Sequence, residues 1–311
     1  MPFMKTFRPH FFRFCLPLYL VFLLVYIAST NSYSQSNDLK FSRLTVRDGL
    51  SHNNVYAIVQ DNYGYLWFGT QDGLNRYDGK TIRVIRNEVD NSNSLSTSNF
   101  GKILIDRAGN YWFGTFGGGI DRYDPVTNTF KNFSHVPNDS NSISNNQIIF
   151  IFEDSKGDLW FGTPDGGVNK YNPDDENFTR FRHSENDPSS LSGNRANCMC
   201  ETPDGTLWFG TDSGLNRFDS VNDSFYRYYH NPNTRNSLSG NFIKSMIAND
   251  DGTIWIAIHG GGLNHFDPKT NTFKRYTHNS SDASSISDDK ADCLLKDSNG
   301  NLWVGTYEGE G

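Results

Sequence analysis

The tryptophans of this chain recur at a nearly constant interval. The six of them are separated by 45, 48, 48, 47 and 48 residues. The residues around them recur as well, because Gly-Tyr-Leu-Trp-Phe-Gly-Thr occupies 64–70 and Gly-Thr-Leu-Trp-Phe-Gly-Thr occupies 205–211. A fixed period of this length is typical of one supersecondary unit copied in tandem, here about six times. The six residues are Trp67, Trp112, Trp160, Trp208, Trp255 and Trp303.

Each repeat divides into four short runs that have the length of β-strands and end in turn residues. In the first repeat the runs are 55–59, 66–70, 74–77 and 81–85. Helical solenoids are excluded, because their repeats need apolar residues three and four positions apart and no such stripe is present. The pattern predicts an all-β fold, a β-propeller of four-stranded blades in which the last of about six repeats is incomplete. We expect the tryptophan of each second strand to lie in the core between blades.

A tight turn of the form Asp-x-x-Gly joins the first two runs of most repeats. It occurs at 61–64, 106–109, 154–157 and 297–300, whereas Thr202-Pro203 and Asn249-Asp250 depart from it. Glycine takes a positive φ there at no steric cost, and the aspartate bonds to nearby backbone. The motif is similar to the Asp-box of sialidase propellers, but it has one residue too many between Asp and Gly. It lacks the oxygen ligands of a calcium loop, so we predict a hairpin turn.

Charge limits the function of the chain. The formal net charge is -7, and charged residues make up 20% of the sequence. Since no basic surface is expected, we predict no direct nucleic-acid binding by this segment. A basic residue recurs in the third run of five repeats, and we predict that it pairs with a neighbouring acid; these residues are Arg76, Arg122, Lys170, Arg217 and His265.

The four cysteines form no ligand pattern. Cys15 precedes the repeats, and Cys198, Cys200 and Cys293 fall inside predicted strands, where they are expected to be small core residues. No other residues have metal-ligand spacing. The sequence therefore predicts no metal site, no cofactor and no catalytic residues in this segment.

The amino terminus is different in character from the repeats. Three basic residues, Lys5, Arg8 and Arg13, precede an apolar run over 14–28. Residues 1–34 are therefore predicted to be a signal peptide, cleaved before Gln35, or else an N-terminal membrane anchor.

The repeats themselves are expected to continue beyond this sequence. The segment 41–44 is similar to an outer strand, and the last repeat stops at Gly311, before its third strand. A sheet edge exposed in this way is unfavourable. We expect residues 40–311 to be a propeller sensor domain truncated within its last blade, with seven blades when intact; a sequencing truncation or a broken gene are the alternatives.

The two ends of the predicted propeller differ in sequence. The tight-turn end repeats with few changes, whereas the other end, which we call the variable face, carries long polar loops. Its loops between second and third strands change from repeat to repeat, which is typical of a recognition surface on a constant scaffold. Aromatic and hydrogen-bonding side chains there suit a sugar. The candidate ligand-binding residues are Gln71, Phe116, Asp212, His259, Tyr307 and Glu308.

These repeats resemble the two-component regulator propeller family over nearly all of residues 40–311. The first motif is Asp48-Gly49-Leu50-Ser51, and a Leu-Ser or Ile-Ser pair returns at the head of each later repeat. Leu-Trp-Phe-Gly-Thr and Gly-Leu-Asn-Arg-Tyr-Asp complete the match. The later pairs stand at 95–96, 143–144, 191–192, 238–239 and 286–287.

The resemblance implies the periplasmic sensor region of a hybrid histidine kinase whose parent protein lies in the inner membrane. It also implies an oligosaccharide or other small-molecule ligand, and a homodimer formed through the parent receptor. Kinase activity would belong to that parent and not to these residues. A diguanylate cyclase is the alternative output. A propeller glycosidase or lyase is a further alternative, which needs paired carboxylates or an activated nucleophile in the central cleft.

Overall fold

A computed structural model of the chain describes residues 41–307. The chain divides into the units Met1–Arg43 and Leu44–Gly311, and every described strand belongs to the second. The signal peptide or anchor predicted over 1–34 lies outside the described residues. Within 41–307, no helix has the length and apolar character that a bilayer span requires. One short 3₁₀-helix, η1 (Val46–Asp48), precedes the strands.

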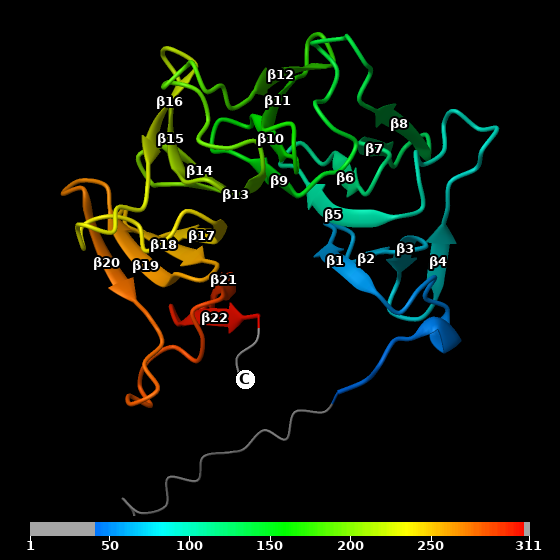
Figure 1. Cartoon of the computed structure of the whole chain (residues 1–311). Coiled ribbons are helices and arrows are strands. Elements are labelled where there is room, and N and C mark those ends of the chain that lie inside the picture. Colours follow the sequence, from blue (N-terminus) through cyan, green and yellow to red (C-terminus); the bar gives the residue numbers. More distant parts are fainter. Residues whose placement is uncertain (1–40, 308–311) are drawn as a thin grey trace, which may run out of the picture. The chain divides into compact units, whose positions relative to one another are not determined.

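The described strands form five four-stranded antiparallel sheets and one two-stranded sheet, and the strands pair in chain order (Figure 1). This architecture confirms the predicted β-propeller, and we number its blades 1 to 6 along the chain. Blades 1 to 3 comprise β1 (Val55–Gln60), β2 (Leu66–Thr70), β3 (Gly73–Tyr77), β4 (Ile82–Ile85), β5 (Phe100–Ile105), β6 (Tyr111–Thr115), β7 (Ile120–Asp124), β8 (Thr129–Phe133), β9 (Phe150–Glu153), β10 (Leu159–Gly162), β11 (Val168–Asn172) and β12 (Asn177–Phe181). Blades 4 to 6 comprise β13 (Ala196–Glu201), β14 (Leu207–Thr211), β15 (Leu215–Asp219), β16 (Ser224–Tyr228), β17 (Ile243–Ala248), β18 (Ile254–Ile258), β19 (Gly262–Asp267), β20 (Thr272–Tyr276), β21 (Ala291–Lys296) and β22 (Leu302–Thr306).

The first strand of each blade lies nearest to the middle of the propeller, and in blades 1 to 5 the fourth strand lies at its outer edge (Figure 1). Second strands such as β6 and β14 are buried at every position. Because neighbouring blades cover both faces of these strands, they read as continuous apolar runs and not as an alternating pattern. The glycine in this run permits close approach, since a Cβ on Gly114 would lie 2.8 Å from Ile148 Cγ2 of the next blade.

Four of the six tryptophans lie in the core between blades. Trp67, Trp112, Trp160 and Trp208 are each 1% exposed. Each packs against at least one aromatic ring of the following blade; Trp67, for example, lies 5.3 Å from Tyr111 and 5.8 Å from Phe113 between ring centroids. Burying one such side chain contributes roughly 2–3 kcal/mol to stability.

The last two tryptophans depart from this arrangement. Trp255 is only partly buried, and Trp303 is 62% exposed, so the prediction of a core position is wrong for Trp303. The physical reason is that no blade among the described residues follows blade 6 to cover its ring. Cys293 of the same blade is also exposed, contrary to expectation, whereas Cys200 is buried and Cys198 partly buried.

The spare outer strand predicted over 41–44 is not a strand in the structure. Phe41 is 87% exposed and Leu44 is 39% exposed. Its expected partner, the third strand of the last blade, is not among the described residues.

The predicted acidic partners of the third-strand basic residues are present in two blades. Arg122 Nη2 lies 2.9 Å from Glu176 Oε1, and Lys170 Nζ lies 2.6 Å from Asp158 Oδ2. In blades 1 and 4 the prediction is wrong, because Arg76 and Arg217 lie over aromatic rings instead. His265 contacts Thr253 Oγ1 and the ring of Trp255.

Two sets of side chains hold the long loops of the variable face. In blades 1, 3, 4 and 5 the Ser that opens the repeat is bonded to an amide of the third strand, as when Ser51 N donates to Asn75 Oδ1 over 2.8 Å. In blade 2 the carboxylate of Asp121 replaces this amide and accepts from Ser96 N. Arginines of the fourth strands donate to loop carbonyls, as Arg275 Nε does to Ser237 O over 2.9 Å.

Candidate ligand-binding face

The candidate residues of the variable face lie where a second strand ends. At this point the antiparallel register brings each of them beside the residue that precedes the first strand of the same blade. The backbone N–H donates to that residue's carbonyl in four blades: Phe116 to Asn99 (2.9 Å), Asp212 to Arg195 (3.1 Å), His259 to Phe242 (2.9 Å) and Tyr307 to Lys290 (3.0 Å). The face therefore includes Asn99, Arg195 and Phe242, which the sequence analysis missed.

Aromatic rings gather on this face in blades 5 and 6. The ring of His259 lies 5.5 Å from that of Phe242 and 6.3 Å from that of Tyr307. Tyr307 is 70% exposed, so one side of this group is open to solvent. A second pair, Tyr56 and Phe116, makes an edge-to-face contact at 5.6 Å in blades 1 and 2. These rings offer flat apolar surface next to polar groups.

Two buried polar atoms on this face lack a hydrogen-bond partner. They are Nδ1 of His259 and Oδ1 of Asn99. Buried polar atoms are nearly always paired, so each exception calls for an explanation such as a ligand or an ordered water. The unpaired atoms lie on the residues that also position aromatic rings: His259 contacts Phe242 and Tyr307, and Asn99 accepts from Phe116.

The remaining candidates are spread around the face. Gln71 Oε1 accepts from Asn54 Nδ2 over 3.1 Å, and Asp212 Oδ1 accepts from Ser213 Oγ over 3.0 Å. Both side chains are thus engaged within their own blades. Glu308 lies outside the described residues. The structure therefore brings together His259 and Tyr307, and places Phe116, Asp212 and Gln71 in three other blades.

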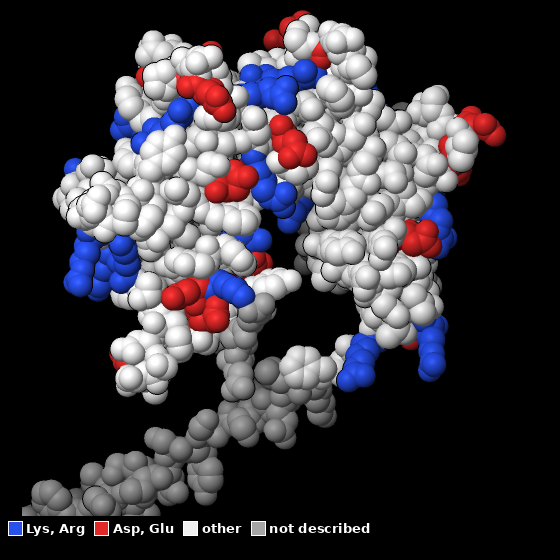
Figure 2. All heavy atoms as spheres, in the orientation of Figure 1, with Lys and Arg blue, Asp and Glu red and all other residues white. Residues whose placement is uncertain are grey.

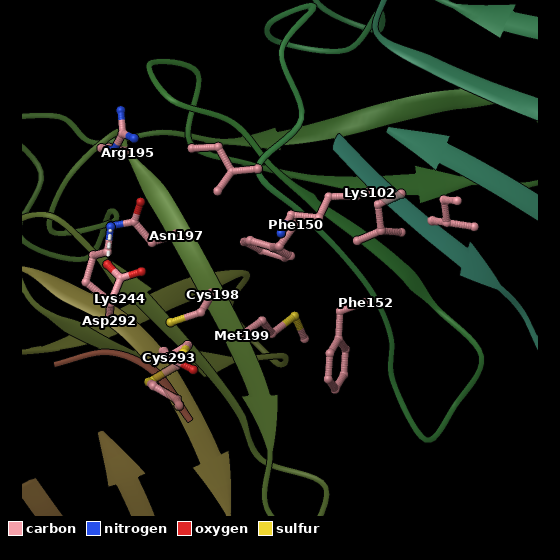
Figure 3. A pocket seen from close by; sticks show the side chains of 15 residues that line it. Lys102, Phe150, Phe152, Arg195, Asn197, Cys198, Met199, Lys244, Asp292 and Cys293 are labelled. Carbon is pink, nitrogen blue, oxygen red and sulfur yellow. Dashed lines mark ion pairs between the residues drawn. The ribbon is translucent and has the colours of Figure 1, made fainter. Parts of the chain in front are cut away.

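A hollow of about 510 Å³ lies between the first strands of blades 2 to 6. Figure 2 shows basic side chains, with acidic ones beside them, at the edge of a hollow between the blades. Arg195, Lys102 and Lys244 line it, and Lys244 Nζ lies 2.8 Å from Asp292 Oδ1. Arg195 stands at one end of β13, with Asn197, Cys198 and Met199 following along the strand (Figure 3).

The lining of this hollow holds few groups of the kind used in acid–base or nucleophilic catalysis, among the residues that the structure describes. Asp292 is the one carboxylate among its described lining residues, whereas glycoside hydrolysis uses two. Burial raises the pKa of Cys198 to about 12, so its thiol stays protonated and is a poor nucleophile. Within residues 41–307, no three His, Cys, Asp or Glu side chains are arranged to hold a metal ion.

The fold and the repeated blades define a β-propeller that carries one constant end and one variable face. Four segments, 49–72, 142–165, 190–213 and 285–308, match the family described as Two component regulator propeller. The resemblance is thereby confirmed, and the chain contains repeats of the two-component regulator propeller family.

Individual relatives cover parts of this chain. A 63-residue segment of this chain is 44% identical to Histidine kinase P4 of Formosa agariphila. The segment makes up 20% of this chain and corresponds to 5% of that protein. The extracellular domain of a putative hybrid two component system from B. thetaiotaomicron is similar in structure, with 24% identity, a TM-score of 0.50, and coverage of 86% of this chain and 40% of that chain. PorZ, a surface component of the type-IX secretion system of Porphyromonas gingivalis, is 17% identical with a TM-score of 0.62, over 82% of this chain and 38% of its own. The two structures show the fold, and the chain spans less than half the length of each of these three relatives.

Proposed function

We propose that residues 44–307 belong to the extracytoplasmic sensor region of a hybrid histidine kinase and that the variable face binds an oligosaccharide. The observation that carries this proposal is the group of Phe242, His259 and Tyr307, in which the ring of His259 lies near the other two rings and its Nδ1 is buried without a hydrogen-bond partner. A sugar ring stacks on aromatic surface through its C–H groups and offers hydroxyls to an imidazole nitrogen.

Several observations favour this ligand class and this output. Among the described residues of this face, Arg195 and Asp212 carry opposite charges, Lys244 is paired with Asp292, and Lys102 adds one positive charge. This small net charge suits a polar and nearly neutral ligand better than a strongly charged one. The 63-residue match to a histidine kinase favours kinase output over a cyclase. The parent protein would lie in the inner membrane and act as a homodimer, whose two states would bind the ligand with different affinity and so transmit the signal.

Binding to an oligosaccharide panel tests the proposal. The complete receptor ectodomain is titrated by calorimetry, and the best ligand is then measured with Phe116, His259 and Tyr307 all replaced by alanine. We expect the affinity to fall at least about 100-fold, as the loss of two or three stacking residues implies. The control replaces Val126 and Val221, which are 91% and 88% exposed in tight turns at the other end, by alanine. Unchanged affinity in the triple variant would refute the proposed face.

A further inference from the structure

Trp208 differs from the other tryptophans of the core in having no acceptor for its indole N–H. In blades 1, 2, 3 and 6 the indole Nε1 donates to the Asp of the Asp-x-x-Gly turn over 2.8–3.0 Å. In blade 4 that aspartate is replaced by Thr202. The Thr202 hydroxyl donates instead to Asp204 Oδ1 and Thr206 O, and Trp208 Nε1 has no partner although its residue is 1% exposed.

A cleft of about 480 Å³ lies beside this turn. It is formed by the tight turns of blades 4 and 5, at the opposite end of the blades from the variable face, and Thr202 and Trp208 are part of its lining. A buried donor left without an acceptor costs about 1–3 kcal/mol. In blades 1, 2, 3 and 6 an aspartate carboxylate accepts the hydrogen bond of the equivalent indole. A carboxylate is therefore the acceptor that fits the Trp208 indole best.

A second donor faces the same cleft. Arg217 lines it, and its guanidinium carbon lies 4.3 Å from the ring centroid of Tyr226. Among residues 41–307 it forms no ion pair, unlike Arg122 and Lys170 at the equivalent positions. An arginine fixed on an aromatic ring and open to a cleft is well suited to receive a carboxylate. Lys269, whose Nζ donates to Asp251 O over 3.0 Å, adds positive charge.

The same cleft also has acidic groups at its rim. Asp204, Asp250 and Asp251 line it, and hydrogen bonds from Thr202 and Thr253 hold the carboxylates of Asp204 and Asp251 ionised, with the pKa of each below its usual value. These carboxylates repel a multiply charged anion but accept hydrogen bonds from hydroxyl groups. The side chains that line the cleft therefore suit a ligand with a single carboxylate and several hydroxyls.

We propose that this cleft is a second binding site, which takes a hydroxylated monocarboxylate of the sugar-acid class. The ligand's carboxylate accepts from Trp208 Nε1 and Arg217, in the place that the turn aspartate occupies in the sister blades. Its hydroxyls donate to Asp204 and Asp251. The site is independent of the oligosaccharide proposed for the variable face.

The full chain labelled with 5-fluorotryptophan provides the test. The ¹⁹F resonance of Trp208 is identified by its loss in Trp208→Phe, and the protein is titrated with D-glucuronate, D-glucose and acetate. We expect a saturable shift of this resonance with D-glucuronate, none with D-glucose, and at least about tenfold weaker binding of acetate, which lacks the hydroxyls.

Two variants at one position separate the explanations. Thr202→Asp restores the carboxylate of the sister repeats and is expected to abolish the D-glucuronate shift, because its own Oδ2 then accepts from the indole. Thr202→Ser adds no carboxylate and is expected to bind D-glucuronate as the unsubstituted chain does. The proposal fails if the Trp208 resonance does not respond, as expected for a buried water alone, if D-glucose or acetate acts as strongly as D-glucuronate, or if Thr202→Asp binds unchanged.

Discussion

The indole Nε1 of Trp112 donates a hydrogen bond of 2.8 Å to Oδ2 of Asp106, and both residues are buried. The other oxygen of Asp106 accepts from Asn110 N over 2.7 Å, inside the tight turn. One carboxylate therefore closes the turn and fixes the core tryptophan six positions later. The sequence interpretation of Asp-x-x-Gly as a hairpin turn accounts for only the first of these two roles.

Replacing Asp106 by alanine is expected to lower the free energy of unfolding by about 2–4 kcal/mol. The substitution removes a charged acceptor and leaves the Trp112 indole buried without a partner. Chemical denaturation of the full chain measures the loss. Thr202→Ala at the equivalent position of blade 4 is the matched control, with an expected loss of about 1 kcal/mol, because no indole bond is broken there. Equal losses in the two variants would show that the indole bond contributes nothing.

Most of the fold followed from the repeat, because strand length, turn residues and period are local properties. The second strand of blade 1 was predicted at 66–70 and is β2 (Leu66–Thr70). The position of Trp303 could not be predicted in the same way. Its burial depends on a neighbouring blade and not on its own repeat, whose residues match those of the buried tryptophans.

The candidate site was predictable only in part. Variation between repeats identified Phe116 and His259, since these positions stand on a constant scaffold. Asn99 and Phe242 were missed because they are about 17 residues earlier in the chain and join the face only through antiparallel pairing. The register of first and second strands would have revealed them. Nothing in the local sequence of blade 4 shows that Trp208 lacks an acceptor except the change from Asp to Thr202.

Asp121 makes the stability of the protein depend on pH. It occupies the place of the asparagine of the other blades, and burial raises the pKa of its carboxyl to about 7, against the hydrogen bonds from Ser96 and Asn132 that lower it. The folded state therefore binds this proton more tightly than the unfolded chain, in which the pKa is 3.8. Stability is greatest below pH 3.8 with respect to this group and falls as the pH rises towards about 7.

Asp121→Asn is expected to remove this dependence. The amide keeps the acceptor for Ser96 N and adds a donor for its hydroxyl, as Asn75 does for Ser51. At a pH above this raised pKa, the variant is expected to be more stable than the unsubstituted protein by about 1–3 kcal/mol, since each unit of pKa difference corresponds to about 1.4 kcal/mol. Thermal unfolding across the pH range measures both proteins. A parallel pH profile in the two would contradict the role assigned to Asp121.

Arg275 is expected to order a loop without determining the fold. Its guanidinium donates to Thr234 O, Ser237 O and Leu238 O in the loop between blades 4 and 5. Lysine has no planar fork and cannot reach three carbonyls at once. In Arg275→Lys we expect amide hydrogen exchange in residues 231–241 to rise about tenfold while the core strands keep their protection. Lys274→Arg, on the opposite side of the same strand, serves as the control. If amide exchange in residues 231–241 were the same in Arg275→Lys as in Lys274→Arg, the loop would be held by contacts other than those of Arg275.

Gly167 and Gly157 both have a positive φ, +75° and +89°, but only the first lies against another part of the backbone. A Cβ at Gly167 would collide with the carbonyl oxygen of Phe181 in the outer strand of its own blade, whereas a Cβ at Gly157 would have no atom within 4 Å. Alanine at Gly157 therefore costs only the strain of the left-handed conformation, about 1 kcal/mol. Alanine at Gly167 adds the collision, and because β11 and β12 pair at this point, relief requires the two strands to separate. We expect a loss of about 3–4 kcal/mol by denaturant unfolding. If the two variants lost the same stability, the conformation of the backbone alone, and not the close approach of the third and fourth strands, would explain the glycine that opens the third strand.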